Sequence, residues 1–271
     1  MAVIIALTSR MQAAGTDKIT STPDLSQTDP AGAFEGDGSN YCAPVAISNS
    51  LMYLSRHGFP DLASQETSTK DAQIEVVHYL ASPDYLKTDA NSGTNPAKIL
   101  IGLTAYLADC GYGEATLEYE GWREVSERFD QGAERPDLDW LRAGIDNPTG
   151  AVWLNVGWYK YNSDTDEYYR VGGHWVTLVG HGVDADGEED PAAFVIHNPL
   201  SKNGNRVSHD IIYAEQITSG TLTATGQNRL KGLPRSAKGY YEIHRATRHT
   251  RRLYRNPRRR DSPKHGRTLI A

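Results

Sequence analysis

Apolar residues in the first half of the chain recur every three or four positions, the period of a helix with one buried face. This pattern predicts helices over Pro44–Arg56, Asp71–Leu80 and Pro96–Asp109, with two shorter ones around Trp122–Phe129 and Leu138–Ile145. Before them, residues 19–40 are rich in Gly, Asp, Ser and Pro, which is typical of a loop.

The second half of the chain contains stretches rich in Val, Ile, Tyr and Trp, separated by acidic segments with turn-forming residues. These stretches predict strands over Ala151–Trp158, Tyr168–Val183, Ala193–His197, Val207–Tyr213 and Gly239–His244. Helices followed by strands indicate an α+β fold, with an N-terminal helical layer packed on a C-terminal antiparallel sheet.

The two ends of the chain are predicted to lie outside the folded domain. Residues 1–20 open with a short apolar run that no Lys or Arg precedes, so they are interpreted as a signal remnant or a disordered terminus. Residues 245–271 lose all periodicity and predict a basic, disordered tail. We therefore expect the folded domain to span residues 21–244, with cytoplasm and export both open as locations.

Charge and composition narrow the class of protein further. The 271 residues carry a net charge of −6, but residues 245–271 hold ten Lys and Arg against one acid. This tail contributes +9, so the remaining residues carry −15. A nucleic-acid-binding domain would place its basic residues on folded elements, so nucleic acid is not an expected partner beyond the tail. No apolar run reaches the roughly 18 residues of a membrane span.

Cysteine usage excludes further classes of site. Two cysteines are too few for a disulfide scaffold or a four-thiolate zinc site. Neither an H-E-x-x-H nor a C-x-x-C pattern is present. We expect no metal and no cofactor.

Cys42 is the first candidate for chemistry. It stands between the Gly-rich loop and the first long helix, in N-Y-C-A-P-V-A-I-S-N-S-L. The positive end of a helix dipole favours the thiolate, which is the nucleophilic form. A buried, unreactive cysteine is the alternative, because free cysteine is among the most buried residue types.

His174 and Asn198 are the second and third candidates. His174 opens the apolar strand G-G-H-W-V-T-L-V-G, where an imidazole could take the proton of a thiol. Asn198 ends the strand A-F-V-I-H-N-P, and its amide oxygen could orient that imidazole if the two strands pair. Taken separately, a core histidine and a turn asparagine explain them equally well.

The order of these three residues agrees with one kind of enzyme. His174 lies 132 residues and Asn198 156 residues after Cys42. Papain-type enzymes place His and Asn about 130–150 residues after a Cys that opens the first helix.

The strings around the three residues resemble the papain-like cysteine peptidases called "peptidase C thirty-nine-like". These are relatives of bacterial peptidases that remove double-glycine leaders from exported peptides. The resemblance covers roughly residues 23–244. It implies a papain-like fold with Cys42 as nucleophile, His174 as general base and Asn198 as the orienting residue.

The sequence departs from that family at the oxyanion hole. Ala43 follows the cysteine where the family usually has Gly, and the nearest upstream glutamine is Gln27, fifteen residues before Cys42. Gln27, or alternatively Asn40, is the expected donor to the oxyanion. Losing one such donor costs about 2.7–4 kcal/mol of transition-state stabilisation.

Two classes of function stay open. The first is a thiol-dependent hydrolase, a cysteine peptidase or amidase that acts on a peptide or protein substrate, with an acyltransferase as a close variant. The second is a non-catalytic peptide-binding module on the same fold. A weaker hypothesis makes the basic tail the functional element, recruiting an acidic partner or nucleic acid.

Overall fold

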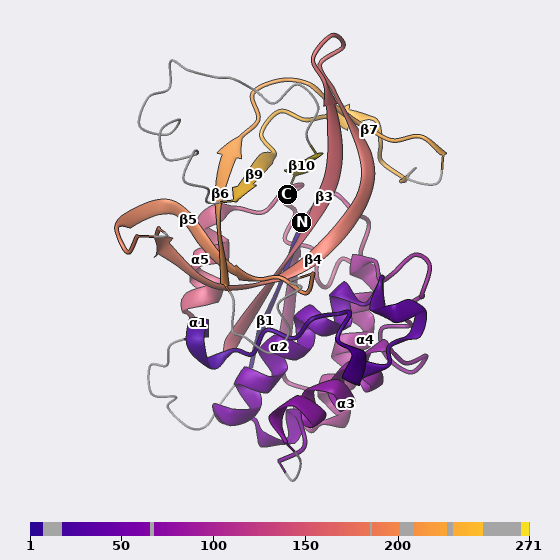
Figure 1. The fold of residues 1–271 in the computed structure, drawn as a ribbon, viewed down its shortest axis with the longest axis vertical. Helices are drawn as coiled ribbons and strands as arrows, with labels where there is room; N and C mark the ends of the chain where they lie inside the picture. The colour runs from indigo at the N-terminus through magenta and orange to yellow at the C-terminus, as the bar shows by residue number, and fades with distance from the viewer. Residues whose placement is uncertain are drawn as a thin grey trace. The chain divides into compact units, whose positions relative to one another are not determined.

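The computed structural model describes residues 1–7, 18–65, 68–184, 186–200, 209–226, 230–245 and 267–270. They form a mixed α+β structure of helices and a largely antiparallel sheet, as predicted (Figure 1). The helices are α1 (Lys18–Ser21), α2 (Cys42–Arg56), α3 (Thr69–Ala81), α4 (Pro96–Asp109) and α5 (Leu138–Asp146), with short 3₁₀ turns η1 (Pro30–Gly32), η2 (Glu35–Gly38) and η3 (Pro60–Leu62). The strands are β1 (Ala2–Ala6), β2 (Thr116–Glu120), β3 (Gly150–Asn162), β4 (Glu167–Val183), β5 (Glu189–His197), β6 (His209–Gln216), β7 (Thr221–Thr223), β8 (Arg235–Ser236), β9 (Tyr241–Arg245) and β10 (Arg267–Ile270).

The chain divides into two compact units. Unit 1 comprises the described residues of Met1–Leu154, Trp175–Gly180 and Ile196–His209. Unit 2 comprises those of Asn155–His174, His181–Val195 and Asp210–Ala271. The strands β3, β4 and β5 contribute residues to both units.

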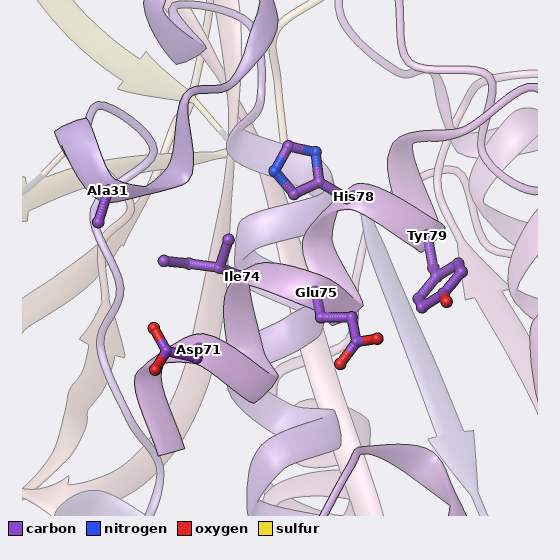
Figure 2. A pocket seen from close by; sticks show the side chains of 6 residues that line it. All are labelled: Ala31, Asp71, Ile74, Glu75, His78 and Tyr79. Carbon is purple, nitrogen blue, oxygen red and sulfur yellow. The ribbon is translucent and has the colours of Figure 1, made fainter. Parts of the chain in front are cut away.

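Helix α2 is the centre of unit 1. Every residue from Ala43 to Ser55 is buried, so the helix lies inside the unit rather than on its surface. Two of its three serines bond within the helix, since Ser48 donates to the carbonyl of Val45 and Ser55 to that of Met52. Helix α3 packs against α2 and exposes its other side, which carries Asp71, Glu75 and Tyr79 (Figure 2).

Strand β1 corrects the expectation of a disordered start for residues 2–6. It pairs antiparallel with both β2 and β3, Val3 standing opposite Tyr119 on one side and Trp153 on the other. Val3 and Ile5 join the helical core, whereas Ile4 lies against Gly144 of α5. Ala2–Ala6 is continuously apolar because both faces of this central strand are covered.

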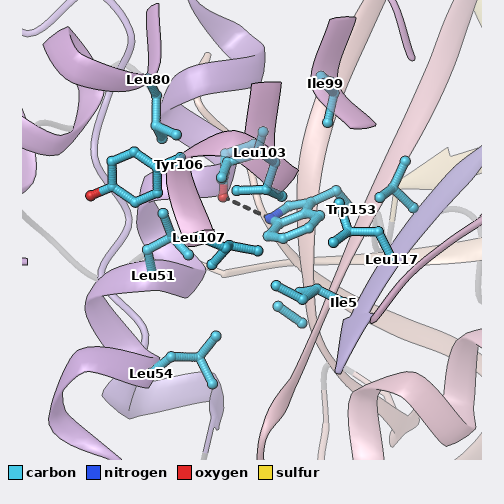
Figure 3. Packing of buried hydrophobic residues seen from close by; sticks show 14 of the residues in the cluster. Ile5, Leu51, Leu54, Leu80, Ile99, Leu103, Tyr106, Leu107, Leu117 and Trp153 are labelled. Atoms are coloured by element: carbon cyan, nitrogen blue, oxygen red, sulfur yellow. Dashed lines mark hydrogen bonds between the residues drawn. The ribbon is translucent and has the colours of Figure 1, made fainter. Parts of the chain in front are cut away.

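Trp153 joins the sheet of unit 1 to its central helix. The indole is 1% exposed and packs among aliphatic side chains of α2, α4 and the neighbouring strands (Figure 3). Its Nε1 donates a hydrogen bond of 3.1 Å to the carbonyl of Ala46, drawn as the dashed line in Figure 3. This contact satisfies the polar atom of the indole at a fully buried position.

Unit 2 is built from strands. The strand order of the described sheet is β2-β1-β3-β10-β9-β6-β5-β4-β7-β8, with an additional pairing of β3 with β4. β10 pairs antiparallel with β3 and β9, although the sequence predicted a disordered tail over residues 245–271. Residues 246–266 of that tail lie outside the described residues.

The remaining differences from the predicted elements are local. The segment 122–129 is not helical. Instead it returns the chain to β2, where the amide of Tyr119 donates to the carbonyl of Phe129 and the amide of Gln131 to the carbonyl of Tyr119. The long helices begin and end close to their predicted bounds, and α2 begins at Cys42, two residues earlier than predicted.

Candidate active site

Cys42 is the first residue of α2, and backbone N–H groups around it act on its thiol. Tyr41 precedes the helix without a capping side chain. Pro44 has no N–H group, and the amide of Val45 makes the first helical bond, to the carbonyl of Tyr41 at 3.1 Å. Two amides of the first turn remain, those of Cys42 and Ala43, and both lower the pKa of the thiol.

Burial nevertheless dominates the acidity of this thiol. It raises the pKa of Cys42 to about 11, although backbone N–H groups of Trp175, Ala43 and Cys42 itself lower it. The helix terminus thus acts in the predicted direction but is outweighed by the loss of water around the sulfur. At neutral pH the thiol holds its proton in this environment, so a base must take that proton before Cys42 can act as a nucleophile.

Trp175 supplies the third N–H group to Cys42. It is 3% exposed in β4, and its indole Nε1 donates to the carbonyl of Thr94 at 3.1 Å. In the sequence it directly follows His174. The amide contact therefore joins Cys42 to the neighbour of the predicted base.

Strand β4 makes a second contact with α2, at a matching distance along the helix. Two residues after Trp175, the hydroxyl of Thr177 donates to the carbonyl of Ala46 at 2.7 Å, one helical turn beyond Cys42. Two residues of strand rise about 6.6 Å and four residues of helix about 6 Å, so successive contacts match. This agreement fixes the register of the β4 segment along the helix.

Asn198 follows the end of β5 in unit 1 and is 7% exposed. Its Oδ1 accepts the amide of Leu200 at 3.0 Å, which makes a turn around Pro199. The carbonyl of Pro199 in turn accepts the amide of Gln27 at 2.8 Å. Asn198 and Gln27, 171 positions apart in the sequence, therefore lie on adjacent segments.

Gln27 also holds the loop that leads to Cys42. Its Nε2 donates to the carbonyls of Gly38 and Ser39, both at 2.9 Å. Among the described residues its buried Oε1 has no hydrogen-bond partner. Since both N–H bonds of the amide are engaged, one must open before Gln27 can donate to an oxyanion.

Two further features define this loop. Gly38 has a φ of +72°, and a Cβ there would lie 1.6 Å from the carbonyl oxygen of Gln27, so only glycine fits. Asn40, the alternative oxyanion donor, uses its Nδ2 to donate to the carbonyl of Ala90 at 2.7 Å. Both predicted donors thus make contacts that shape the loop.

His174 belongs to unit 2 and is 4% exposed. Asn155 donates from its Nδ2 to the backbone carbonyl of His174 at 3.2 Å. The indole of Trp158 lies 6.4 Å from the imidazole, centroid to centroid, with the rings inclined by 35°. Asn155 and Trp158 were not predicted as site residues.

The structure thus gathers Cys42, Gln27, Asn40 and Asn198 in unit 1. The backbone N–H group of Trp175 near the sulfur escaped the sequence analysis, because main-chain donors have no signature in residue type. A buried polar network under α2 was also missed, in which Asn49 bonds to Leu25, Gln73 and Thr177. A polar side chain within an apolar helix stripe was its only signal.

Comparisons with protein-family models, with curated proteins and with solved structures found no match. Within the described ranges, no three His, Cys, Asp or Glu side chains gather as a metal site would require. Nor does any described helix have the length and apolar character needed to cross a membrane.

Proposed function

We propose that this chain is a thiol-dependent hydrolase, a cysteine peptidase or amidase of papain-like architecture. Cys42 attacks the carbonyl carbon of a peptide or amide bond, His174 transfers the proton, and Asn198 orients the imidazole. The carrying observation is the hydrogen bond to the Cys42 thiol from the amide of Trp175, the residue next to His174.

The electrostatics around Cys42 support a transfer of its proton to a base. A thiol with a pKa of about 11 is ionised in only about one molecule in 10⁴ at pH 7. An imidazole that accepts the proton changes this, because an adjacent imidazolium favours the thiolate. The backbone N–H groups of Trp175, Ala43 and Cys42 lower the pKa of the thiol, so they stabilise the charge as it forms.

The reaction then proceeds in two halves. The thiolate forms a bond to the carbonyl carbon, and the imidazolium gives its proton to the leaving amine as the C–N bond breaks. Water, deprotonated by the imidazole, then attacks the carbonyl carbon of the thioester. The C–S bond breaks, which regenerates the thiolate of Cys42 and releases the acid product. The backbone amides of Cys42 and Ala43, at the start of α2, are the donors that we assign to the oxyanion.

A peptide-binding module is the competing function, and two observations favour it. Burial raises the pKa of Cys42, and both N–H bonds of Gln27 serve the loop. An acyltransferase would use the same three residues with an amine in place of water.

The pH dependence of alkylation separates the two classes. The rate of Cys42 alkylation by iodoacetamide is measured between pH 5 and pH 11 in a Cys110→Ala background, with and without His174→Ala. The hydrolase predicts a rate that titrates well below the free-thiol pKa of about 8.5 and a loss of this low-pH reactivity in His174→Ala.

The matched control is Asn162→Ala, which removes an amide side chain from the hairpin end of β3 and leaves His174 intact. An alkylation rate that rises only toward pH 11, with and without His174→Ala, would refute the hydrolase and leave the binding module. Where the alkylation supports a thiolate, hydrolysis of a peptide amide library against a Cys42→Ser control identifies the substrate.

A further inference from the structure

Unit 1 carries a surface hollow that the proposed triad does not use. It has a volume of about 580 Å³ and lies between the exposed side of α3 and the η1 turn (Figure 2). The residues that line it are Ala31, Asp71, Ile74, Glu75, His78 and Tyr79. Five of the six belong to α3, at the spacing of one helix face.

The two walls of this hollow are fastened to each other. Lys70 at the start of α3 forms a 2.8 Å ion pair with the buried carboxylate of Asp29, which caps η1. Nε2 of His78 lies 2.8 Å from the carbonyl oxygen of Gly32. The aromatic ring of Phe34 packs 5.2 Å from the imidazole of His78, centroid to centroid. The hollow is therefore preformed rather than dependent on an occupant.

Its chemistry is acidic at the rim and apolar at the floor. Asp71 and Glu75 are exposed carboxylates one helical turn apart, while Ile74 is half-buried between them and the η1 turn. Tyr79 is 54% exposed. Among the residues that the structure describes, no Lys or Arg lines the hollow, and the nearby Lys70 is paired with Asp29.

We propose that this hollow is a docking site for a cationic peptide segment that carries one apolar side chain. Lysine or arginine groups of the segment pair with Asp71 and Glu75, the apolar side chain covers Ile74 and Ala31, and the ring of Tyr79 offers a face to a cation. The net charge of −6 on the full chain favours the approach of such a partner over longer distances.

The hollow is connected to the candidate active site through packed aromatic rings. Phe34 packs on His78 on one side and stacks on Tyr41 on the other, with ring centroids 5.2 Å apart and 16° between planes. Tyr41 directly precedes Cys42. The site thus anchors a peptide beside the helix that carries Cys42, yet it binds whether or not Cys42 is catalytic.

The test measures binding in a full-length Cys42→Ser background, so turnover cannot contribute. The probe is fluorescein-labelled Lys-Lys-Leu-Lys-Lys, followed by fluorescence anisotropy, with Glu-Glu-Leu-Glu-Glu as the reversed-charge control. The Asp71→Asn, Glu75→Gln double variant should bind about fivefold more weakly, because two exposed ion pairs are lost. The asparagine retains the oxygen that accepts the Ser68 hydroxyl at the start of α3.

The matched control is Glu114→Gln with Glu127→Gln, which removes two exposed carboxylates of unit 1 outside the hollow. Unchanged binding in this control supports the site, and Tyr79→Ala should weaken the probe independently. Equal loss in both double variants would show attraction by net charge alone and overturn the proposal, as would absence of binding.

Self-association is the remaining outcome. If sedimentation shows that the chain forms dimers and that the Asp71→Asn, Glu75→Gln variant abolishes them, a second copy is the occupant and the peptide proposal is wrong. None of these results depends on the alkylation of Cys42, so the two proposals fail separately.

Discussion

Asn49 should be one of the costliest polar residues to replace, because its amide connects four segments of unit 1. It is fully buried in α2. Its Oδ1 accepts the backbone N–H of Leu25 at 3.2 Å and Nε2 of Gln73 at 2.7 Å, and its Nδ2 donates to Thr177 at 3.4 Å. Leucine has the same number and branching of side-chain heavy atoms, although its methyl groups are bulkier, so Asn49→Leu removes these bonds without leaving a cavity.

The magnitude follows from what each partner loses. The N–H of Leu25 loses the acceptor it has in Asn49, and an unpaired buried donor costs about 1–3 kcal/mol. Gln73 keeps its bond to the hydroxyl of Ser48 at 3.1 Å, so its loss is smaller. The bond to Thr177 is long and contributes least. Together they predict a loss of about 2–4 kcal/mol in the free energy of unfolding.

Urea denaturation followed by tryptophan fluorescence measures this loss. The matched control is Ser55→Ala, a buried change whose hydroxyl bonds only within its own helix, and it should cost less than about 1 kcal/mol. In a double-mutant cycle, Asn49→Leu with Gln73→Leu should show a coupling of about 1 kcal/mol. An Asn49→Leu protein as stable as Ser55→Ala, or a cycle without coupling, would refute the network.

Three further predictions concern single positions. Lys18 donates to three backbone carbonyls, and burial lowers its pKa to about 8. Between about pH 8 and pH 10.4 the unfolded protein therefore binds more protons at this lysine than the folded protein does, so its contribution to the free energy of unfolding rises with pH. Urea denaturation across this pH range should show a smaller rise in Lys18→Met. Gly144→Ala places a Cβ 2.5 Å from Cδ1 of Ile4 and should lower the free energy of unfolding by about 1–3 kcal/mol, measured by urea denaturation. The comparison variant is Gly111→Ala, whose Cβ meets no atom within 4 Å but whose positive φ adds backbone strain of its own. Gln27→Glu turns a buried carboxylate toward the carbonyls of Gly38 and Ser39. Because the carboxyl group can donate to these carbonyls only when it is protonated, the melting temperature of the variant should rise as pH falls. A pH-independent melting temperature would contradict the loop contacts.

Sequence patterns predicted the elements whose environment is local. The helix at Pro96–Asp109 has its bounds set by Asn95, whose side chain caps the amide of Lys98, and by a regular apolar stripe. β1 and β10 were missed because pairing with distant strands, rather than composition, determines them. An apolar start resembles a leader and a basic end resembles a tail until partner strands are known.

The candidate site divides in the same way. The position of Cys42 at a helix start could be predicted, since proline and loop residues mark that boundary. Its acidity could not, because a helix dipole is visible in the sequence whereas the burial that raises the pKa is not. The roles of Gln27 and Asn40 in the loop depend on carbonyl groups of Gly38, Ser39 and Ala90, which any residue type would present.

The matched rise of β4 and α2 has a consequence for how this chain tolerates changes of length. An inserted or deleted residue between Trp175 and Thr177 would separate the Cys42 contact from the Ala46 contact and turn the following side chains to the opposite face. The exposed turn at residues 163–166, by contrast, joins β3 to β4 and can vary without disturbing either contact. Insertions that preserve reactivity at Cys42 should therefore be found at that turn and be absent from residues 175–177.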